Sequence, residues 1–394
     1  MIHVASRAFQ IVAVLGCAAG FVYYLFCLWS AAVFLRERRA GRSARTTQSL
    51  PPVSILKPLK GVDPEIYASF RSHCLQDYPE YEIIFGVSDA GDPAVGSVRQ
   101  LQQEFPERAI RLMVCDKILG TNVKVSNLEQ MVGVAKFEHL IVNDSDIQVE
   151  RDYLRRVIAP LAERSDDERG VGLVTCLYRG VAAPALGSQL ESLGIVDFCA
   201  SVLVARQLEG ELRFGLGSTL AFRRNDLERA GGFRAIVDYL ADDYELGRRI
   251  ASLGLKVELS DVVVETHLPA YTTREFFAHQ LRWARGVRDA RASGYAGLIA
   301  TFGLFWALLN VIAAHAAPWS GILLGAMVLL RLAVVFVGAN SVLHDKQFLK
   351  HLWLLPFRDL IAVWVWIASF AGHTVTWRGD RFELKNGKLL RLEP

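Results

Sequence analysis

Several features that mark common protein classes are missing from this sequence. Its 6 cysteines are scattered and none forms a Cys-x-x-Cys pair, so they show neither zinc-site spacing nor a disulfide framework. The formal net charge is only +3 and the basic residues are dispersed, which argues against nucleic acid as a partner. Internal repeats and low-complexity segments are also absent. The cysteine pattern agrees with a reducing compartment.

Hydrophobic residues, in contrast, make up 52% of the chain, so we expect both a soluble part and a membrane part. No charged residue occurs from Ala8 to Leu35, which is long enough to cross a bilayer and far longer than the apolar region of a signal peptide. We therefore expect residues 1–35 to form a membrane helix and residues 36–52 a basic juxtamembrane linker. The positive-inside rule then places the following domain in the cytosol, beside what we expect to be a bacterial inner membrane. The charged residues after the helix are Arg36, Glu37, Arg38, Arg39, Arg42 and Arg45.

The C-terminal third is apolar again, and residues 295–376 predict two or three membrane helices. Arg331, Arg358 and Asp359 interrupt these segments, and such groups are costly in hydrocarbon unless they face protein or reach the surface. The basic tail, residues 377–394, favours a cytosolic C-terminus, whereas three full crossings would put it outside. The apolar blocks are Tyr295–Ala317, Trp319–Leu343 and Leu352–Val375.

Between the membrane segments, residues 53–294 alternate short apolar strands with helices, which predicts an α/β domain with a largely parallel sheet. Acidic residues follow successive strands, as is typical of nucleotide-binding folds. The expected strands are 53–57, 81–87, 110–114, 139–142 and 214–223, and the expected helices are 64–76, 93–105, 124–136, 244–253 and 274–291.

Two aspartates, Asp144 and Asp146, come directly after the apolar strand 139–142. Side chains alternate along an extended segment, so both carboxylates should point the same way. Ligands of open α/β sheets bind outside the carboxyl ends of the strands, where two carboxylates suit Mg²⁺ or Mn²⁺ carrying a phosphate-bearing substrate. The alternative is an ordinary polar turn.

Two further polar segments lie at the same predicted edge. Asp89 and Asp92 follow the second strand, where a carboxylate can bind a ribose or a base, although Asp92 can equally cap the helix that begins at Pro93. Lys124 lies in a polar loop ahead of a helix and is a candidate for binding a diphosphate, against the alternative of a solvated lysine.

A second acidic pair, Asp242 and Asp243, precedes the helix 244–253. Asp242 with Glu245 matches a capping box, which gives Asp242 a structural role. Asp243 remains as a candidate base for an attacking hydroxyl, or as a surface carboxylate favoured by the helix dipole.

The helix 274–291 places His279, Arg282 and Trp283 near one another. A guanidinium there would neutralise a departing diphosphate, and the same residues would also suit a juxtamembrane anchor. His267 is a possible neutral metal ligand or an ordinary structural histidine. The apolar segment 184–207 is either a surface helix that guides a lipid or a core helix.

Taken in order, these motifs resemble those of the ceramide glucosyltransferases, and bacterial hopanoid-associated glycosyltransferases are similar. The resemblance covers residues 53–288 and the flanking membrane segments. The motifs are SILKPLKG (Ser54–Gly61), SDAGDP (Ser88–Pro93), GTNVKVSNL (Gly120–Leu128), NDSDI (Asn143–Ile147), GSTLAFRR (Gly217–Arg224), ADDYEL (Ala241–Leu246) and HQLRW (His279–Trp283).

The resemblance implies a GT-A-type glycosyltransferase domain that binds a UDP-sugar and glycosylates a membrane lipid with inversion at the cytosolic face. It implies a donor-site role for Asp92, metal and diphosphate binding by Asp144 and Asp146, and a catalytic-base role for Asp243. Arg282 and Trp283 match the end of the family's Q/R-x-x-R-W element, and His279 replaces its first residue.

We expect one direct displacement, because no separate nucleophile with an adjacent base is evident in the sequence. The activity that the resemblance favours is the transfer of glucose from UDP-glucose to ceramide. A hopanoid N-acetylglucosaminyltransferase, a processive polysaccharide synthase and a non-catalytic nucleotide-sugar receptor remain alternatives, although the few membrane spans argue against the synthase.

Overall fold

A computed structural model describes residues 2–44, 50–162, 169–377 and 379–392, so part of the predicted linker, including Arg45, lies outside the described residues. An eight-stranded mixed sheet forms the centre of the molecule, in the order β3-β2-β1-β4-β7-β6-β8-β5. Its strands are β1 (Val53–Pro58), β2 (Tyr81–Val87), β3 (Ala109–Val114), β4 (His139–Val142), β5 (Ile147–Gln148), β6 (Val171–Val181), β7 (Leu220–Arg223) and β8 (Lys256–His267).

The first half of the sheet is parallel and the second half is mixed. Strands β3, β2, β1 and β4 run parallel, and every residue of β1 and β2 is buried, as continuous apolar strands covered on both faces require. Strand β7 is antiparallel to β4 and β6, whereas β6 and β8 are parallel and β5 is antiparallel to β8. The prediction of a largely parallel sheet therefore holds for β1 to β4 and for the pair β6 and β8, whereas β7 and β5 run antiparallel to their neighbours.

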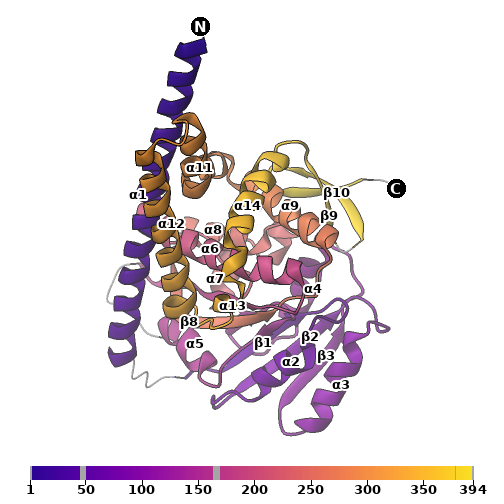
Figure 1. The fold of residues 1–394 in the computed structure, drawn as a ribbon. Helices are drawn as coiled ribbons and strands as arrows, with labels where there is room; N and C mark the ends of the chain where they lie inside the picture. Colours follow the sequence, from indigo (N-terminus) through magenta and orange to yellow (C-terminus); the bar gives the residue numbers. More distant parts are fainter. Residues whose placement is uncertain (1, 45–49, 163–168, 378, 393–394) are drawn as a thin grey trace.

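The helices of the α/β domain connect and cover these strands (Figure 1). Helix α4 begins after Asn122, whose side chain accepts a hydrogen bond from the Val125 amide, and α9 begins with a capping box between Thr272 and Glu275. The helices are α2 (Ile66–Cys74), α3 (Ala94–Glu104), α4 (Val123–Val132), α5 (Tyr153–Ala162), α6 (Leu186–Glu209), α7 (Arg224–Arg229), the 3-10 helix η1 (Phe233–Ile236), α8 (Asp242–Ser252) and α9 (Thr273–Ala290).

Long apolar helices lie along one side of the molecule, where α1 runs beside α11 and α12 (Figure 1). The first helix continues through the basic flank to Ala44 instead of ending near Leu35. The remaining helices are α10 (Ala292–Gly297), the 3-10 helix η2 (Leu298–Thr301), α11 (Gly303–Ala313), α12 (Pro318–Phe336), the π-helical turn η3 (Val337–Val342), α13 (Phe348–His351), the 3-10 helix η4 (Leu352–Leu354) and α14 (Leu355–Ser369).

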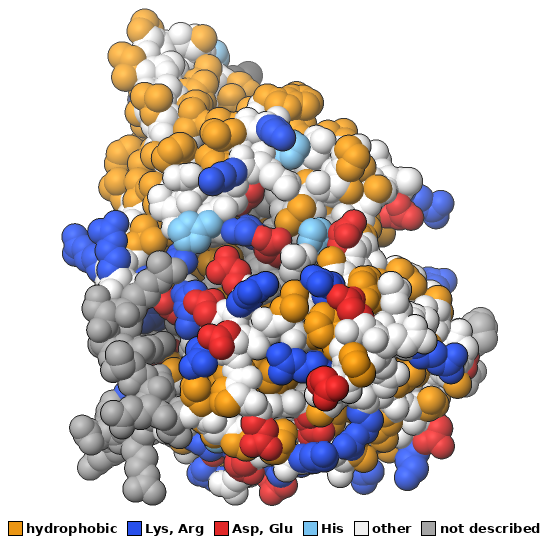
Figure 2. All heavy atoms as spheres, turned by 90° about the horizontal axis from the view of Figure 1, so that it is seen from below, with side chains coloured by type: hydrophobic (Ala, Val, Ile, Leu, Met, Phe, Trp, Pro, Cys, Tyr) orange, Lys and Arg blue, Asp and Glu red, His pale blue; other side chains and the backbone are white. Residues whose placement is uncertain are grey.

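Among the described residues, 4 helices are long and apolar enough to cross a membrane. A pair bent by 52°, Ala292–Thr301 with Gly303–Ala313, would make a fifth if it is one span. Figure 2 shows hydrophobic side chains gathered at one end of the face seen from below, while most of the charged side chains lie scattered over the rest of this face. The four candidates are Arg7–Ala40, Leu186–Glu209, Pro318–Val342 and Phe348–Ser369.

Helix α6 corresponds to the apolar segment 184–207. It contacts β6, α1 and α14, and most of its apolar side chains are buried, including Leu190, Leu193 and Val196. The structure thus favours the core helix over the surface helix that would guide a lipid.

Two of the charged residues within the apolar segments, Arg331 and Asp359, pair with each other. The Arg331 guanidinium of α12 donates two hydrogen bonds to the Asp197 carboxylate of α6, at 2.8 and 2.9 Å. It donates two more to the Asp359 carboxylate of α14, at 3.0 and 2.6 Å. The Arg331 side chain is only 5% exposed. This network ties three helices together and explains how the chain accommodates these groups.

A three-stranded antiparallel sheet follows α14, where the sequence had indicated only a basic tail. Asn386 and Gly387 form its tight turn, with φ of 54° and 79°, and the sheet packs on the loop before α8. The Leu389 amide donates to the Asp238 carbonyl at 2.7 Å, and the Leu240 amide donates to the Gly387 carbonyl at 3.1 Å. The strands are β9 (Thr374–Trp377), β10 (Asp380–Lys385) and β11 (Lys388–Arg391).

The contact between the C-terminal sheet and the α/β domain bears on membrane topology. Two parts that touch must lie on the same side of a membrane, so the chain between α9 and β9 must cross it an even number of times or not at all. This contact argues against three full crossings, in agreement with the charge of the tail.

Candidate active site

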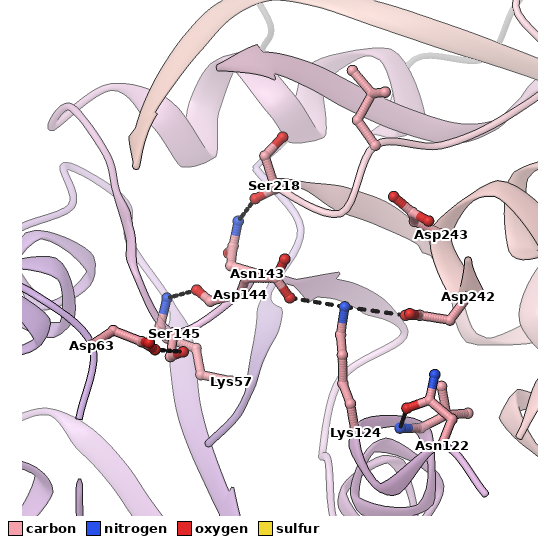
Figure 3. Close-up of polar contacts among 12 residues, drawn as sticks. Lys57, Asp63, Asn122, Lys124, Asn143, Asp144, Ser145, Ser218, Asp242 and Asp243 are labelled. Carbon is pink, nitrogen blue, oxygen red and sulfur yellow. Dashed lines mark hydrogen bonds and ion pairs between the residues drawn. The ribbon is translucent and has the colours of Figure 1, made fainter. Parts of the chain in front are cut away.

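The centre of the site is an ammonium group between two carboxylates (Figure 3). Lys124, in the first turn of α4, places its Nζ 2.8 Å from Asp144 Oδ1 and 3.1 Å from Asp242 Oδ2. Burial opposes its charge, but Asp144, Asp242 and Asp243 outweigh this effect and raise the pKa of Lys124. Lys124 therefore remains a cation at the carboxyl ends of the strands.

Asp243 lies in the first turn of α8, beside the same group. Its Oδ1 accepts a hydrogen bond from the Tyr244 amide at 2.8 Å. A Cβ atom built on Gly217 would lie 3.2 Å from Oδ2 of Asp243 and 3.2 Å from Oδ2 of Asp144, so both carboxylates border the space beside this glycine. Burial and the charge of Asp242 raise the pKa of Asp243 to about 6, although Lys124 opposes the shift.

Asp146 faces a different partner from Asp144, so the prediction that the two side chains point the same way is wrong. Strand β4 ends at Val142 and the following residues turn, so strand alternation no longer applies. Asp144 contacts Lys124, whereas Asp146 accepts a hydrogen bond from the Thr266 hydroxyl on β8. Burial and the charge of Asp144 raise the pKa of Asp146 to about 6.

Lys57 supports the aspartate loop, a role that was missed from the sequence. This fully buried lysine on β1 donates to the Asp144 carbonyl at 2.9 Å, and burial lowers its pKa to about 7 despite the nearby acids. Asn143 donates to the Ser218 carbonyl at 2.7 Å and so fastens the loop of Asp144 to that of Gly217. A lysine within an apolar strand was the available signal, since a buried lysine requires a partner.

The predicted capping box at α8 is wrong. The residue before the first turn is Ala241, and no side chain caps the helix. Asp242 pairs with Lys124 instead, while Glu245 binds Arg248 and Arg249. The contact with Lys124, distant in sequence, overrides the local motif.

The loop of residues 237–241, which leads to Asp243, is fastened from two sides. The Asn122 side chain donates to the Tyr239 carbonyl at 2.8 Å, and Asp238 accepts from the Thr121 amide and hydroxyl at 2.9 and 3.0 Å. Strand β11 holds its other side through the Leu389 amide. The loop thereby links the segment of Lys124 to the start of α8.

Replacing Asp238 by Ala should loosen this link. We expect a loss of about 1–3 kcal/mol in unfolding free energy, since two donors of Thr121 lose their acceptor, and a lower turnover because Asp243 is held less firmly. Thermal unfolding and initial rates in detergent would measure both effects. Asp152→Ala, which removes an exposed pair with Arg156, is the matched control. Equal stability of the two variants would contradict the prediction.

Asp92 acts as a backbone acceptor in this structure. Its carboxylate accepts hydrogen bonds from the Gly61 amide at 3.1 and 2.9 Å and from the Ala94 amide at 2.9 Å. It therefore caps the start of α3 and joins the loops after β1 and β2, while Asp89 accepts from Gly91 at 2.9 Å. A donor-site role for Asp92 remains a prediction.

His279 and Trp283 lie on α9 in a second cluster. The His279 ring stacks on Tyr271 at 5.4 Å and lies 5.6 Å from Trp283, which contacts Phe198 of α6 at 5.8 Å. Arg282 lies close enough to Tyr271 to lower the pKa of its hydroxyl, although burial has the larger, opposite effect.

His267, the possible metal ligand, places its Nε2 2.9 Å from Gln148 Oε1 across β5 and β8. Within the described residues, no group of three or more His, Cys, Asp or Glu side chains is arranged to hold a metal ion. A metal at this site would therefore need ligands from a substrate or from water.

Comparisons with known proteins place the chain among glycosyltransferases. The chain is 22% identical over 398 residues to ceramide glucosyltransferase 1 of Caenorhabditis elegans, covering 97% of this chain and 82% of that protein. A shorter match to the ceramide glucosyltransferase of Komagataella phaffii is 33% identical over 135 residues and covers 32% of this chain and 26% of that protein.

Among solved structures, a mannosyltransferase from Pyrobaculum calidifontis in complex with GDP-Man and Mn²⁺ matches with a TM-score of 0.51 at 20% identity. The match covers 92% of this chain and 98% of that chain, and it shows a shared GT-A fold. The sequence model of the family described as glycosyl transferase family 21 matches residues 12–390 of this chain. The chain is thus a glycosyltransferase and belongs to glycosyl transferase family 21.

Proposed function

We propose that this protein transfers glucose from UDP-glucose to the hydroxyl group of ceramide, with inversion, at the cytosolic face of a membrane. The meeting of Asp144, Asp243 and Lys124 beside Gly217 supports this proposal most directly, since it combines a base with groups for a diphosphate. The relatives named ceramide glucosyltransferases support the choice of sugar and lipid.

Asp144 and Asp146 would contribute carboxylate oxygens to a divalent cation such as Mg²⁺ or Mn²⁺, although they contact Lys124 and Thr266 respectively in this structure. Magnesium is usually held by one or two carboxylates and completes its shell with water and substrate phosphates. Burial, and after it the negative charge of Asp144, raises the pKa of Asp146, and a bound cation would offset that charge. When bound, such a cation supplies charge stabilisation for the leaving diphosphate.

The side chains of the protein supply the remaining steps. Asp243 accepts the proton of the acceptor hydroxyl as its oxygen forms a bond to the anomeric carbon and the bond to UDP breaks. Lys124 and Arg282 place positive charge where the diphosphate departs. Asp92 and the surrounding loops bind the donor, and His279 and Trp283 border the substrates.

Purified protein in detergent, incubated with radiolabelled UDP-glucose, Mn²⁺ and a panel of lipids, tests the proposal. We expect label in the lipid extract with ceramide and loss of that label on chelation. UDP-galactose and UDP-N-acetylglucosamine, together with a hopanoid polyol and diacylglycerol, provide the competing donors and acceptors. A water-soluble polymer or an absence of transfer would contradict the proposal.

The pH dependence of kcat/KM should show an acidic limb. Asp146 and Asp243 both have a pKa raised to about 6, and each must be deprotonated to act, so activity should be constant above about pH 7 and fall as pH decreases through 6. Initial rates measured at two Mn²⁺ concentrations would help to separate the groups, because more Mn²⁺ should lower the pKa of Asp146, a proposed ligand, more than that of Asp243. A profile that stays flat to pH 4.5 would refute the assignment of both groups.

A further inference from the structure

A second polar cluster lies among α6, α9 and α14, apart from the aspartates. Glu191 of α6, with a side chain 4% exposed, accepts a hydrogen bond from the Gln280 amide on α9. The Gln280 carbonyl accepts from Arg358 Nη2 on α14 at 3.3 Å. One amide group thus connects a buried carboxylate to a buried guanidinium.

Two nitrogen atoms of this cluster lack hydrogen-bond partners among the described residues. Arg358 is 9% exposed and its Nε has none, while His279 Nδ1 lies 3.5 Å from Glu191 Oε1 without forming a hydrogen bond. The guanidinium lies against Gly194, where a Cβ atom would come within 2.5 Å of Nη2. Buried polar groups are nearly always paired, so the unpaired Nε of Arg358, close to a carboxylate that His279 reaches only at 3.5 Å, points to a ligand.

A row of aromatic rings connects this cluster to the aspartate site. Tyr271, His279, Trp283, Phe198 and Tyr178 follow one another at ring distances of 5.4, 5.6, 5.8 and 5.9 Å. Burial raises the pKa of Tyr178, and the charges of Glu191, Asp243 and Asp146 add to the shift, so these acids all lie near its hydroxyl. The two polar regions are therefore neighbours.

The other side of the cluster faces the apolar surface of α14. Phe277 of α9 contacts Trp364 of α14 at 5.1 Å. Trp364 is 52% exposed, within a candidate membrane span. A lipid whose chains lie against this surface would direct its polar head towards Glu191. The exposed side chains of α13, η4 and α14 include Leu349, Trp353, Phe357, Leu360, Ile367 and Phe370.

We propose that Glu191, Gln280 and Arg358 bind the polar head of the lipid acceptor and select a neutral head that carries both hydrogen-bond donors and acceptors. Glu191 accepts from a hydroxyl or amide of the head, and Arg358 donates to one of its oxygen atoms. The opposite charges of these two residues balance, and Glu191 repels a phosphate or carboxylate head. This inference rests on the proposed lipid glycosyltransferase function.

Acceptor kinetics test the site with Glu191→Gln. With ceramide in mixed micelles, we expect the KM for ceramide to rise about tenfold or more, since a charged hydrogen bond is lost, while the KM for UDP-glucose stays within about twofold. Glu211→Gln is the matched control, because Glu211 forms surface pairs with Arg169 and Arg213. If Glu191→Gln does not fold, Gln280→Met should raise the KM for ceramide in the same way.

Inhibition by phosphatidic acid provides a measurement that a purely structural role would not change. Glu191→Gln leaves the charge of Arg358 unbalanced, so phosphatidic acid should inhibit this variant at a severalfold lower concentration than the wild type. If the wild type labels ceramide, and the Glu191 and Gln280 variants match Glu211→Gln in KM and inhibition, the inference is wrong. If the wild type labels no lipid, the proposed function is wrong as well.

Discussion

Asp243→Asn is expected to lower turnover by about 10²–10⁴-fold, the usual contribution of general-base catalysis, while donor binding stays nearly unchanged. The amide keeps the size of the carboxylate and can still accept from the Tyr244 amide, so α8 should begin as before. What is lost is a group with a pKa of about 6 that can accept the proton of the attacking hydroxyl. Single-turnover rates and equilibrium binding of UDP-glucose would measure the two effects separately.

Asp242→Asn is the matched control, because it makes the same change at the adjacent residue. Asp242 contacts Lys124 and not the space beside Gly217, so its loss should affect the KM of the donor more than kcat. If Asp243→Asn kept full activity with ceramide, Asp243 would not be the base. Equal losses of kcat in both variants would instead mean that the pair acts through the position of Lys124.

Arg331→Met should be the most destabilising of the substitutions considered. It leaves two acidic side chains without their cation among apolar helices, and removing one partner of a buried pair costs about 3–5 kcal/mol. We expect the lower end of this range, since Asp197 keeps 31% of its side chain exposed. Thermal unfolding in detergent should show a Tm lowered by on the order of 10 °C.

The triple variant Arg331→Met with Asp197→Leu and Asp359→Leu separates the cost of unpaired charge from the loss of attraction. Replacing a whole buried ion network with apolar residues is often neutral or stabilising, so its Tm should return close to that of the wild type. Arg213→Met, at an exposed pair with Glu211, is the control for a surface arginine. A normal Tm for Arg331→Met alone would show that the network contributes little.

Local patterns in the sequence predicted the elements whose formation depends on nearby residues. The strand before Asp144 was predicted at 139–142 and the structure has His139–Val142, because a continuous apolar run suits a strand buried on both faces. The parallel order of β1 to β4 followed from alternating strands and helices. The helix predicted at 274–291 is Thr273–Ala290 in the structure, where a capping box between Thr272 and Glu275 fixes its start.

The errors arose where contacts between distant segments decide the outcome. Asp242 fits a local capping box, yet its carboxylate binds Lys124, and no local pattern indicates this pair. The partners of Arg331 come from α6 and α14, which are distant in sequence. The sequence therefore indicated only that burying a charged arginine in an apolar segment is energetically unfavourable. The C-terminal sheet could have been recognised, because Asn386-Gly387 is a strong hairpin signal, but the charges of the tail were used only to predict a cytosolic C-terminus.

The order of synthesis gives the β11 contact a further consequence. The loop before Asp243 is translated long before the hairpin that supports it, and the membrane helices α12 and α14 are made in between. If the later helices inserted with the wrong orientation, this hairpin would lie on the opposite side of the bilayer from the loop. The loop would then lack its support. We therefore expect activity to depend on correct insertion. A misinserted enzyme would be inactive even before a quality-control protease degraded it.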